Sequence, residues 1–182
     1  MSVSPQIVPI GAGRTVTVLG GDVVTFKVTA AETDGAFSVF ETITPPNGGP
    51  PPHVHQREDE TFYVLEGEFL FQIGGTTAVA RPGTTLVAPR GIPHSFRNVG
   101  LTAGKLLVII SPGGFERFIE DFSQLPANAP PDMAKLAAIG QKHGVKFLAA
   151  CEATRESPRT PRRHFRLPLW HAMFWRKFLP AR

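Results

Sequence analysis

His53, His55 and Glu60 are a closely spaced group of side chains that could bind a metal ion. Residues two apart in an extended segment project to the same face, so the sequence His53-Val54-His55 aims two imidazoles at one point. Glu60 follows five residues after His55, beyond a turn expected at residues 57–59, and can bring a carboxylate back to that point. Imidazole and carboxylate are common ligands of divalent first-row metals, so this spacing predicts a metal site.

A third imidazole is available at His94, which follows Gly91 and Pro93 in a segment that predicts a turn. Three neutral imidazoles and one carboxylate suit one divalent transition metal, namely Fe, Mn, Ni, Co or Cu, with positions left open for water or substrate. Each histidine taken alone is better explained as an ordinary polar residue of the surface. It is the combined spacing that favours a metal site.

Short segments rich in Val, Ile, Thr and Phe must position these side chains. They lie between glycines and prolines, which number 18 each, and several alternate apolar and polar residues, as strands with one buried face do. Gly74-Gly75 predicts a two-residue hairpin between two of them. Since no helical pattern separates the segments, they predict an all-β sandwich or barrel. The predicted strands are residues 16–19, 23–29, 36–44, 61–65, 68–73, 76–80, 84–88, 94–98 and 105–110.

After the last predicted strand, apolar residues recur with helical spacing and predict two helices. A second helix is predicted after the proline-rich residues 126–131, with Asp132 as its N-cap and Gly140 or Gly144 as its end. We therefore expect one domain over residues 1–149, a β-core with a closing helical segment, and a separate tail over residues 150–182. The first helix is predicted from an apolar stripe made by Phe115, Phe118, Ile119 and Phe122.

Two motifs resemble those of the cupin superfamily. The first is H-x-H-x(4)-E-x(6)-G over residues 53–67, the second is G-x(5)-P-x-G-x(2)-H-x(3)-N over residues 83–98, and the 15 residues between them match the spacing of compact bacterial cupins. The resemblance implies a double-stranded β-helix, or jelly-roll barrel, with short C-terminal helices. It also implies four metal ligands, which are His53, His55, Glu60 and His94.

A wider stretch, about residues 10–149, is similar to single-domain bacterial cupins that are described as quercetin dioxygenase-like. This resemblance implies a metal-dependent dioxygenase that uses O2 to cleave a flavonol-like or enediol small aromatic substrate. Glu60 would then be a ligand and a general base at once, because it would take the hydroxyl proton of the substrate as the substrate docks.

An apolar wall is expected beside the metal, because such a substrate is planar and aromatic. Alternate residues of a strand share one face, so Phe62 and Val64 are predicted to point inward with Glu60. Phe96 is predicted to point inward with His94 for the same reason. Phe40 is a fourth candidate for the pocket. Any of these side chains could equally be plain core.

Two other classes of function stay open. One is another metal-dependent cupin reaction, an isomerisation or a decarboxylation. A phosphosugar isomerase would need a basic cluster, and Arg57, Arg90 and Arg97 flank the motifs only loosely; oxalate decarboxylases typically have two cupins in tandem, and this chain has room for one. The other class is a cupin that binds a small molecule without turnover, although all four ligands are present here and no helix-turn-helix motif is found.

The net charge of +4 would suit a nucleic-acid partner, but it is unevenly distributed. Residues 152–182 carry a net charge of +6 and the other 151 residues carry −2, so we expect no nucleic acid on the core. In the tail, a basic amphipathic segment is of the kind that can dock on an anionic membrane surface or in a partner's groove. The alternatives are an extension packed on the barrel, a disordered terminus or a tail unrelated to the fold. The apolar stripe of this segment is Trp170, Met173, Phe174 and Phe178.

The compartment is predicted from three features. The single cysteine, Cys151, excludes an intramolecular disulfide and a cysteine-cluster zinc site. The N-terminal residues lack a charged segment followed by an apolar one, as a secretory signal would have, and the longest strongly apolar run, residues 106–110, is too short to span a bilayer. We therefore expect a cytoplasmic protein, and the resemblance to cupins implies a homodimer.

Overall fold

Alternation of apolar and polar residues builds the first of two antiparallel sheets in the computed structural model, which describes residues 5–126 and 132–148. In one central strand, Leu106, Val108 and Ile110 are fully buried while the residues between them are more exposed, so this face of the sheet lines the core. In spatial order, the strands are β1 (Arg14–Thr17), β2 (Val23–Val28), β3 (Ser38–Thr44), β10 (Gly104–Ser111), β5 (Asp59–Glu66) and β8 (Thr85–Ala88).

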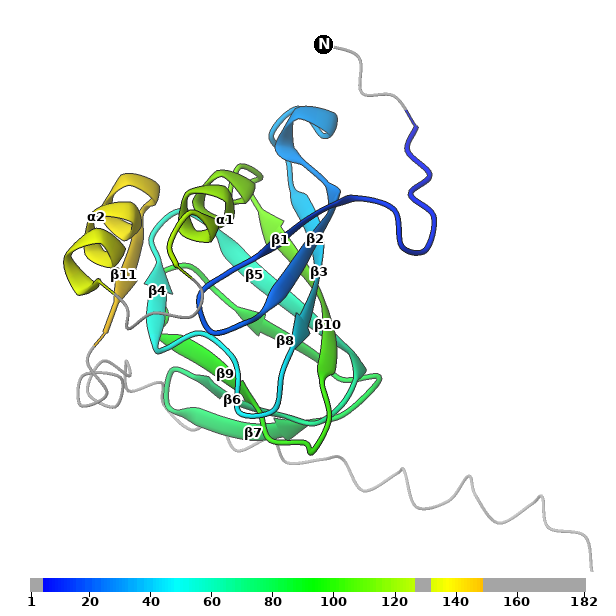
Figure 1. Ribbon diagram of the computed structural model, residues 1–182, viewed down its shortest axis with the longest axis vertical. Coiled ribbons are helices and arrows are strands. Elements are labelled where there is room, and N and C mark those ends of the chain that lie inside the picture. Colours follow the sequence, from blue (N-terminus) through cyan, green and yellow to red (C-terminus); the bar gives the residue numbers. More distant parts are fainter. Residues whose placement is uncertain (1–4, 127–131, 149–182) are drawn as a thin grey trace, which may run out of the picture.

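The second sheet faces the first and closes the barrel (Figure 1). Phe69, Phe71 and Phe96 project from it into the core and pack against one another, with ring centroids 5.5 to 6.3 Å apart. Each buried aromatic ring contributes about 2 to 3 kcal/mol of hydrophobic stabilisation. In spatial order, the strands are β11 (Val145–Phe147), β4 (His53–His55), β9 (His94–Asn98), β6 (Phe69–Ile73) and β7 (Thr76–Ala80).

This architecture confirms the predicted all-β jelly roll with short C-terminal helices. The predicted hairpin at Gly74-Gly75 joins β6 to β7, with Ile73 opposite Thr76 and a positive φ of 55° at Gly74 that favours glycine. Strand boundaries differ from the predicted ones by at most two residues, and β7 and β9 have the predicted bounds. The strand β4 and a 3₁₀ turn, η1 (Ala30–Glu32), were absent from the predicted set because each is only three residues long.

Two α-helices follow the barrel, α1 (Glu116–Ser123) and α2 (Met133–His143). Asp132 is the N-cap of α2 as predicted, since its Oδ1 accepts hydrogen bonds from the backbone N–H groups of Ala134 and Lys135 at 3.1 Å. Gly144, with φ of 77°, ends the helix. Gly140 instead lies inside α2, where a Cβ atom would be 2.5 Å from the carbonyl oxygen of Val145. This glycine allows α2 to pack closely on β11.

Glu116 attaches α1 to the barrel. Its carboxylate accepts hydrogen bonds from the backbone N–H of Ala30 at 3.0 Å, the hydroxyl of Ser38 at 2.6 Å and the backbone N–H of Gly114 at 3.1 Å. Asp121 then joins the two helices, because its carboxylate binds the side chains of both basic residues that end α2. The closing segment is therefore fixed to the barrel by buried as well as exposed polar contacts.

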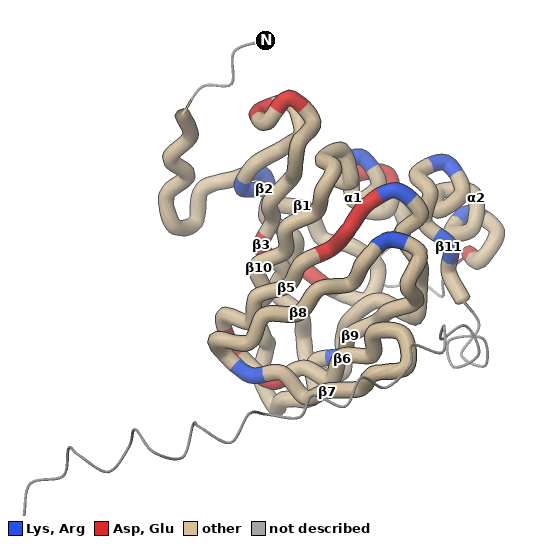
Figure 2. Tube along the Cα trace, turned by 180° about the vertical axis from the view of Figure 1, so that it is seen from behind, with Lys and Arg blue, Asp and Glu red and all other residues tan. Residues whose placement is uncertain are grey.

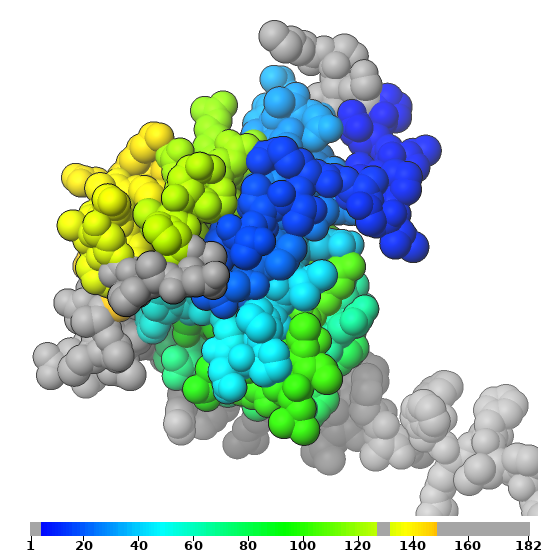
Figure 3. Space-filling view, viewed as in Figure 1, coloured from blue at the N-terminus to red at the C-terminus, as the bar shows by residue number. Residues whose placement is uncertain are grey.

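Ion pairs also connect distant segments at the surface. The start of β5 lies beside the turn that precedes β9, and acidic and basic positions are adjacent there (Figure 2). The Arg90 guanidinium donates two hydrogen bonds to the Asp59 carboxylate, and the shorter of them is 2.7 Å long. On the opposite side, α1 and the first strands lie next to each other (Figure 3), and Arg14 of β1 forms an ion pair with Glu120 of α1.

Some predictions fall outside the described structure. The tail over residues 150–182, and with it the predicted amphipathic segment, lies beyond the described residues. Among the described helices, none combines the length and the apolar character needed to cross a membrane. The single domain over residues 1–149, the homodimer and the cytoplasmic location stay predictions.

Candidate metal centre

The four predicted ligands meet at one point between the two sheets. His53 and His55 come from β4, His94 from the neighbouring β9, and Glu60 from β5 in the facing sheet. One donor atom of each residue lies within 4.8 Å of those of the other three, and all four residues are buried. Spacing along the chain thus predicted which side chains the barrel brings together.

Local backbone contacts hold the strands that carry these ligands. His53 stands opposite His94 in the pairing of β4 with β9. The turn before β9 is fixed to β4 because the N–H of Gly91 donates to the carbonyl of His55 at 2.8 Å, and Gly91 has a φ of 78° that favours glycine. Asn98, at the other end of β9, is structural: its buried side chain makes three hydrogen bonds to the backbone of adjacent loops.

Two of the imidazoles are oriented by hydrogen bonds to the backbone. Nδ1 of His53 lies 2.9 Å from the carbonyl oxygen of Pro51, and Nδ1 of His94 lies 3.0 Å from that of Ile92. In each ring the Nδ1–H donates, so Nε2 is the atom presented to the centre. Metal-binding histidines are commonly fixed in this way.

The charges at the centre favour cation binding. Burial, together with the neighbouring imidazoles, lowers the pKa of His53 to about 3, so its ring is neutral and able to act as a ligand. Burial would raise the pKa of Glu60, but the hydrogen bond from His94 and the nearby imidazoles outweigh it and lower the pKa, so the carboxylate stays ionised. For His94, burial is likewise outweighed by its hydrogen bond to Glu60 and its pKa is raised, so a metal ion on its Nε2 would have to displace a proton.

His55 carries the strongest sign that the donor set fits a metal. Its ring is 1% exposed, and neither ring nitrogen has a hydrogen-bond partner within the described part of the chain. The nearest acceptors, Glu58 Oε2 and Glu60 Oε2, are each 3.5 Å away. A buried polar atom without a partner costs about 1 to 3 kcal/mol, and a metal ion on Nε2 would remove this cost. Three imidazoles and a carboxylate therefore fit a divalent transition metal here.

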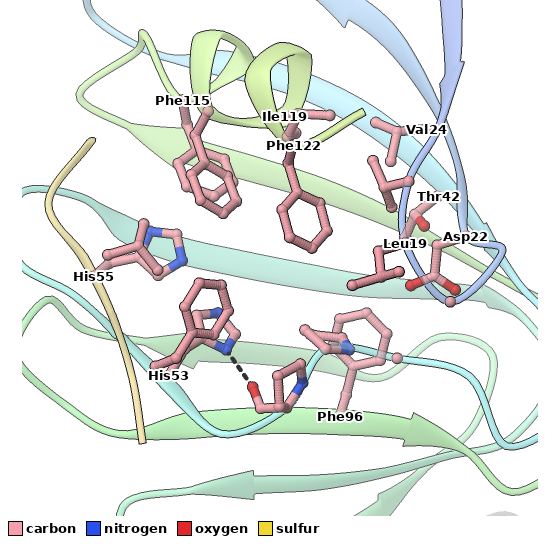
Figure 4. Close-up of a pocket in the computed structure, with 18 of the residues that line it drawn as sticks. Leu19, Asp22, Val24, Thr42, His53, His55, Phe96, Phe115, Ile119 and Phe122 are labelled. Carbon is pink, nitrogen blue, oxygen red and sulfur yellow. Dashed lines mark hydrogen bonds between the residues drawn. The ribbon is translucent and has the colours of Figure 1, made fainter. Parts of the chain in front are cut away.

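A cavity of about 410 Å³ opens onto this centre (Figure 4). Three of the candidate ligands, His53, His55 and Glu60, line it, and most of the remaining wall is apolar. Its volume is in the range of pockets that bind small molecules. The arrangement can therefore hold an apolar small molecule against a metal ion.

The four predicted pocket residues divide into two groups. Phe40 and Phe96 line the cavity. Phe62 and Val64 point inward as their parity predicts, but the structure places them inside the packed core and not on the cavity wall. The ring of Phe62 is covered by Phe71, whose ring centroid is 5.0 Å away. The alternation of residues along a strand determines which side chains point inward, but it does not determine which of them reach the cavity wall.

The closing segment and the first hairpin supply a part of the cavity wall that was not predicted from the sequence. The aromatic stripe of α1 was visible in the sequence, but nothing indicated that it would cover the metal centre. No pattern in the sequence marked Asp22, in the turn between β1 and β2, as a residue of the cavity wall. The missed lining residues include Leu19, Asp22, Phe115, Phe118, Ile119, Phe122, Leu136 and Phe147.

Comparison with known proteins agrees with this geometry. Residues 40–110 match a family model that is described as a cupin domain, and this span contains all four candidate ligands. This part of the chain therefore resembles a cupin domain. KdgF from Halomonas sp. shares the fold, with a TM-score of 0.56 and 18% identity over 63% of this chain and 99% of that one.

Two curated relatives are more similar to this chain in sequence. Germin-like protein 3-5 of Oryza sativa subsp. japonica is 44% identical over 71 residues, which are 35% of this chain and 31% of the relative. Quercetin 2,3-dioxygenase of Bacillus subtilis (strain 168) is 32% identical over 116 residues, 63% of this chain and 33% of the relative. The chain thus spans about a third of the length of these curated relatives.

Proposed function

We propose that this cupin is a metal-dependent oxidoreductase that cleaves a small aromatic substrate, flavonol-like or with an enediol, using O2. The observation that carries the proposal is a three-histidine, one-glutamate cluster that opens into an apolar, aromatic-lined cavity of about 410 Å³. The match to quercetin 2,3-dioxygenase over 63% of this chain supports this choice among cupin reactions.

Glu60 is the residue we expect to move a proton. Its carboxylate faces the cavity, and its lowered pKa leaves it ionised and ready to accept the hydroxyl proton of a bound substrate. Nε2 of His94 lies 3.0 Å from Oε2 of Glu60, so the two atoms are close enough together to bind one metal ion. A bound transition metal would supply a Lewis-acidic, redox-capable centre for reaction of the deprotonated substrate with O2.

The cavity wall selects the substrate class. The rings of Phe96, Phe115 and Phe122 can stack on a planar aromatic molecule and keep water away from it. Among the described residues that line the cavity, none is lysine or arginine. A sugar phosphate would therefore find no basic side chain to bind its phosphate group on the cavity wall. This disfavours the phosphosugar isomerase alternative.

The test combines metal analysis with O2 uptake. The protein is expressed in media supplemented with each candidate metal, and O2 uptake is measured on a panel of flavonols. We expect uptake with at least one metal, and a loss of about 100-fold or more in Glu60→Gln, which keeps much of its metal. The matched control is Glu66→Gln, an exposed carboxylate on the same strand, which should behave as wild type.

Three results would contradict the proposal. Tight flavonol binding without O2 uptake under any metal would indicate a binding cupin. Turnover that does not consume O2 would indicate an isomerase or a decarboxylase. Unchanged activity and metal content in Glu60→Gln would show that Glu60 is not the base.

A further inference from the structure

Asp22 has a buried carboxylate that the proposed chemistry does not use. The residue is 8% exposed, and its Oδ1 has no hydrogen-bond partner within the described part of the chain. The turn that carries it does not need this side chain, because its backbone is already satisfied: Val18 N–H donates to the carbonyl of Asp22 at 2.9 Å and Gly21 N–H to that of Val18 at 3.0 Å. A buried polar group without a partner requires an explanation.

The position of Asp22 in the cavity explains its buried, unpartnered carboxylate. It lines the same cavity as the metal ligands, and Figure 4 shows it at the opposite end from His53 and His55. The wall between the two ends is apolar, with Leu19 and Phe96 among its members. The cavity therefore has two polar ends joined by an apolar middle.

The Asp22 carboxylate can act as a hydrogen-bond acceptor at neutral pH. Burial raises its pKa to about 6, and the nearby Thr44 hydroxyl partly opposes this effect, so most molecules carry the ionised form. Thr44 Oγ1 is itself buried without a hydrogen-bond partner among the described residues. Since no lysine or arginine from the described residues lines the cavity, the carboxylate has no cationic partner on its wall.

We propose that Asp22 is a substrate-recognition residue, which accepts a hydrogen bond from a hydroxyl group on the end of the substrate farthest from the metal centre. The substrate class is then an elongated, otherwise apolar aromatic molecule with metal-binding oxygens at one end and a phenolic hydroxyl at the other. A phenol suits the site better than an ammonium group, because a cation would lose far more hydration in this apolar cavity. The inference rests on the proposed function and narrows its substrate.

The strength of such a contact sets the expected effect. A hydrogen bond to a charged acceptor in a site without water is among the stronger ones in proteins. A site built to bind a hydroxyl also discriminates against the analogue that lacks it, because its own polar group is then left unpaired. We expect a preference of about tenfold to a hundredfold for the hydroxylated ligand.

The experiment measures binding to the metal-loaded protein by calorimetry without O2, so that no turnover occurs. The probes are 3-hydroxyflavone and 3,4′-dihydroxyflavone, which differ only in a hydroxyl on the remote ring. Wild type should prefer the second by about tenfold or more, and Asp22→Leu should bind both about equally. Asp22→Asn, which keeps a neutral acceptor oxygen, should retain a reduced preference. The control Asp34→Asn, at an exposed aspartate, should keep the full preference.

The outcomes separate this inference from the proposed function. The same preference in wild type and Asp22→Leu, or no preference in wild type, would overturn the role of Asp22 alone. If neither probe binds wild type, the proposed function is overturned along with it. If Asp22→Leu does not fold, a preference in Asp22→Asn that equals the wild-type value would overturn the role.

Discussion

Nε2 of His94 lies 3.0 Å from Oε2 of Glu60, although the two residues come from facing sheets of the barrel. Both residues are buried. The contact joins β9 to β5 at the depth where His53 and His55 also converge. The candidate metal centre is therefore a cross-link between the two sheets, and its occupancy should affect the stability of the fold as well as any reaction.

Removing a bound metal should lower the midpoint of thermal unfolding. A ligand that binds only the folded state, present at about 100 times its Kd, adds about 2.7 kcal/mol to the free energy of unfolding. Calorimetry of chelator-treated protein, before and after the metal is restored, measures the difference. His55→Ala should show a much smaller difference. An identical midpoint with and without metal in wild type would argue against a structural cross-link.

Replacing Asp22 with Asn should increase the free energy of unfolding of the metal-free protein at pH 7.5. The increase should be much smaller at pH 4. The folded-state pKa of Asp22, about 6, lies above its ordinary value of 3.8. Wild type therefore loses stability as the pH rises through this window, because the folded state resists deprotonation, whereas the amide does not titrate. We expect a gain of about 1 to 2 kcal/mol at pH 7.5. Urea unfolding at both pH values tests it, and a gain independent of pH would contradict the burial of an ionised carboxylate.

Replacing Glu116 with Ala should detach α1 from the barrel. The change leaves three buried or half-buried donors, on Ala30, Ser38 and Gly114, without their acceptor. We expect a loss of about 2 to 3 kcal/mol in the free energy of unfolding. The control is Glu120→Ala, whose partner is an exposed arginine, with a loss below about 1 kcal/mol. Equal losses in the two variants would mean that the Glu116 contacts do not hold the helix.

Replacing Gly140 with Ala should destabilise the protein, although alanine is the better helix former by about 1 kcal/mol. The added Cβ atom would stand 2.5 Å from the carbonyl oxygen of Val145, so α2 would have to move away from β11. Denaturant unfolding should show a net loss of about 1 to 3 kcal/mol. Gln141→Ala, at the next and exposed position, should change stability by less than about 0.5 kcal/mol. If Gly140→Ala is more stable than wild type, α2 is not packed closely on β11 at this position.

The clustering of the candidate ligands could be predicted from the sequence because their geometry is local. Two histidines on one short strand share a face whatever the rest of the fold does, and turn residues direct His94. The far end of the cavity could not be predicted, because it forms where a hairpin near residue 20 meets helices after residue 115. Asp22 and Phe122 are brought together by the tertiary fold alone. The depth of Phe62 and Val64 in the core is likewise a property of the packing around them.

The central claim, that His53, His55, Glu60 and His94 hold one transition metal, is tested most directly by metal stoichiometry. Protein stripped of metal is titrated with each candidate ion, passed through a desalting column and analysed for metal per chain. We predict about one ion per wild-type chain and a large loss in His55→Ala. His143→Ala, which removes a histidine bound to Asp121 outside the cluster, should retain the wild-type value. Wild-type protein that retains none of the ions, or His55→Ala that retains as much as wild type, would contradict the account.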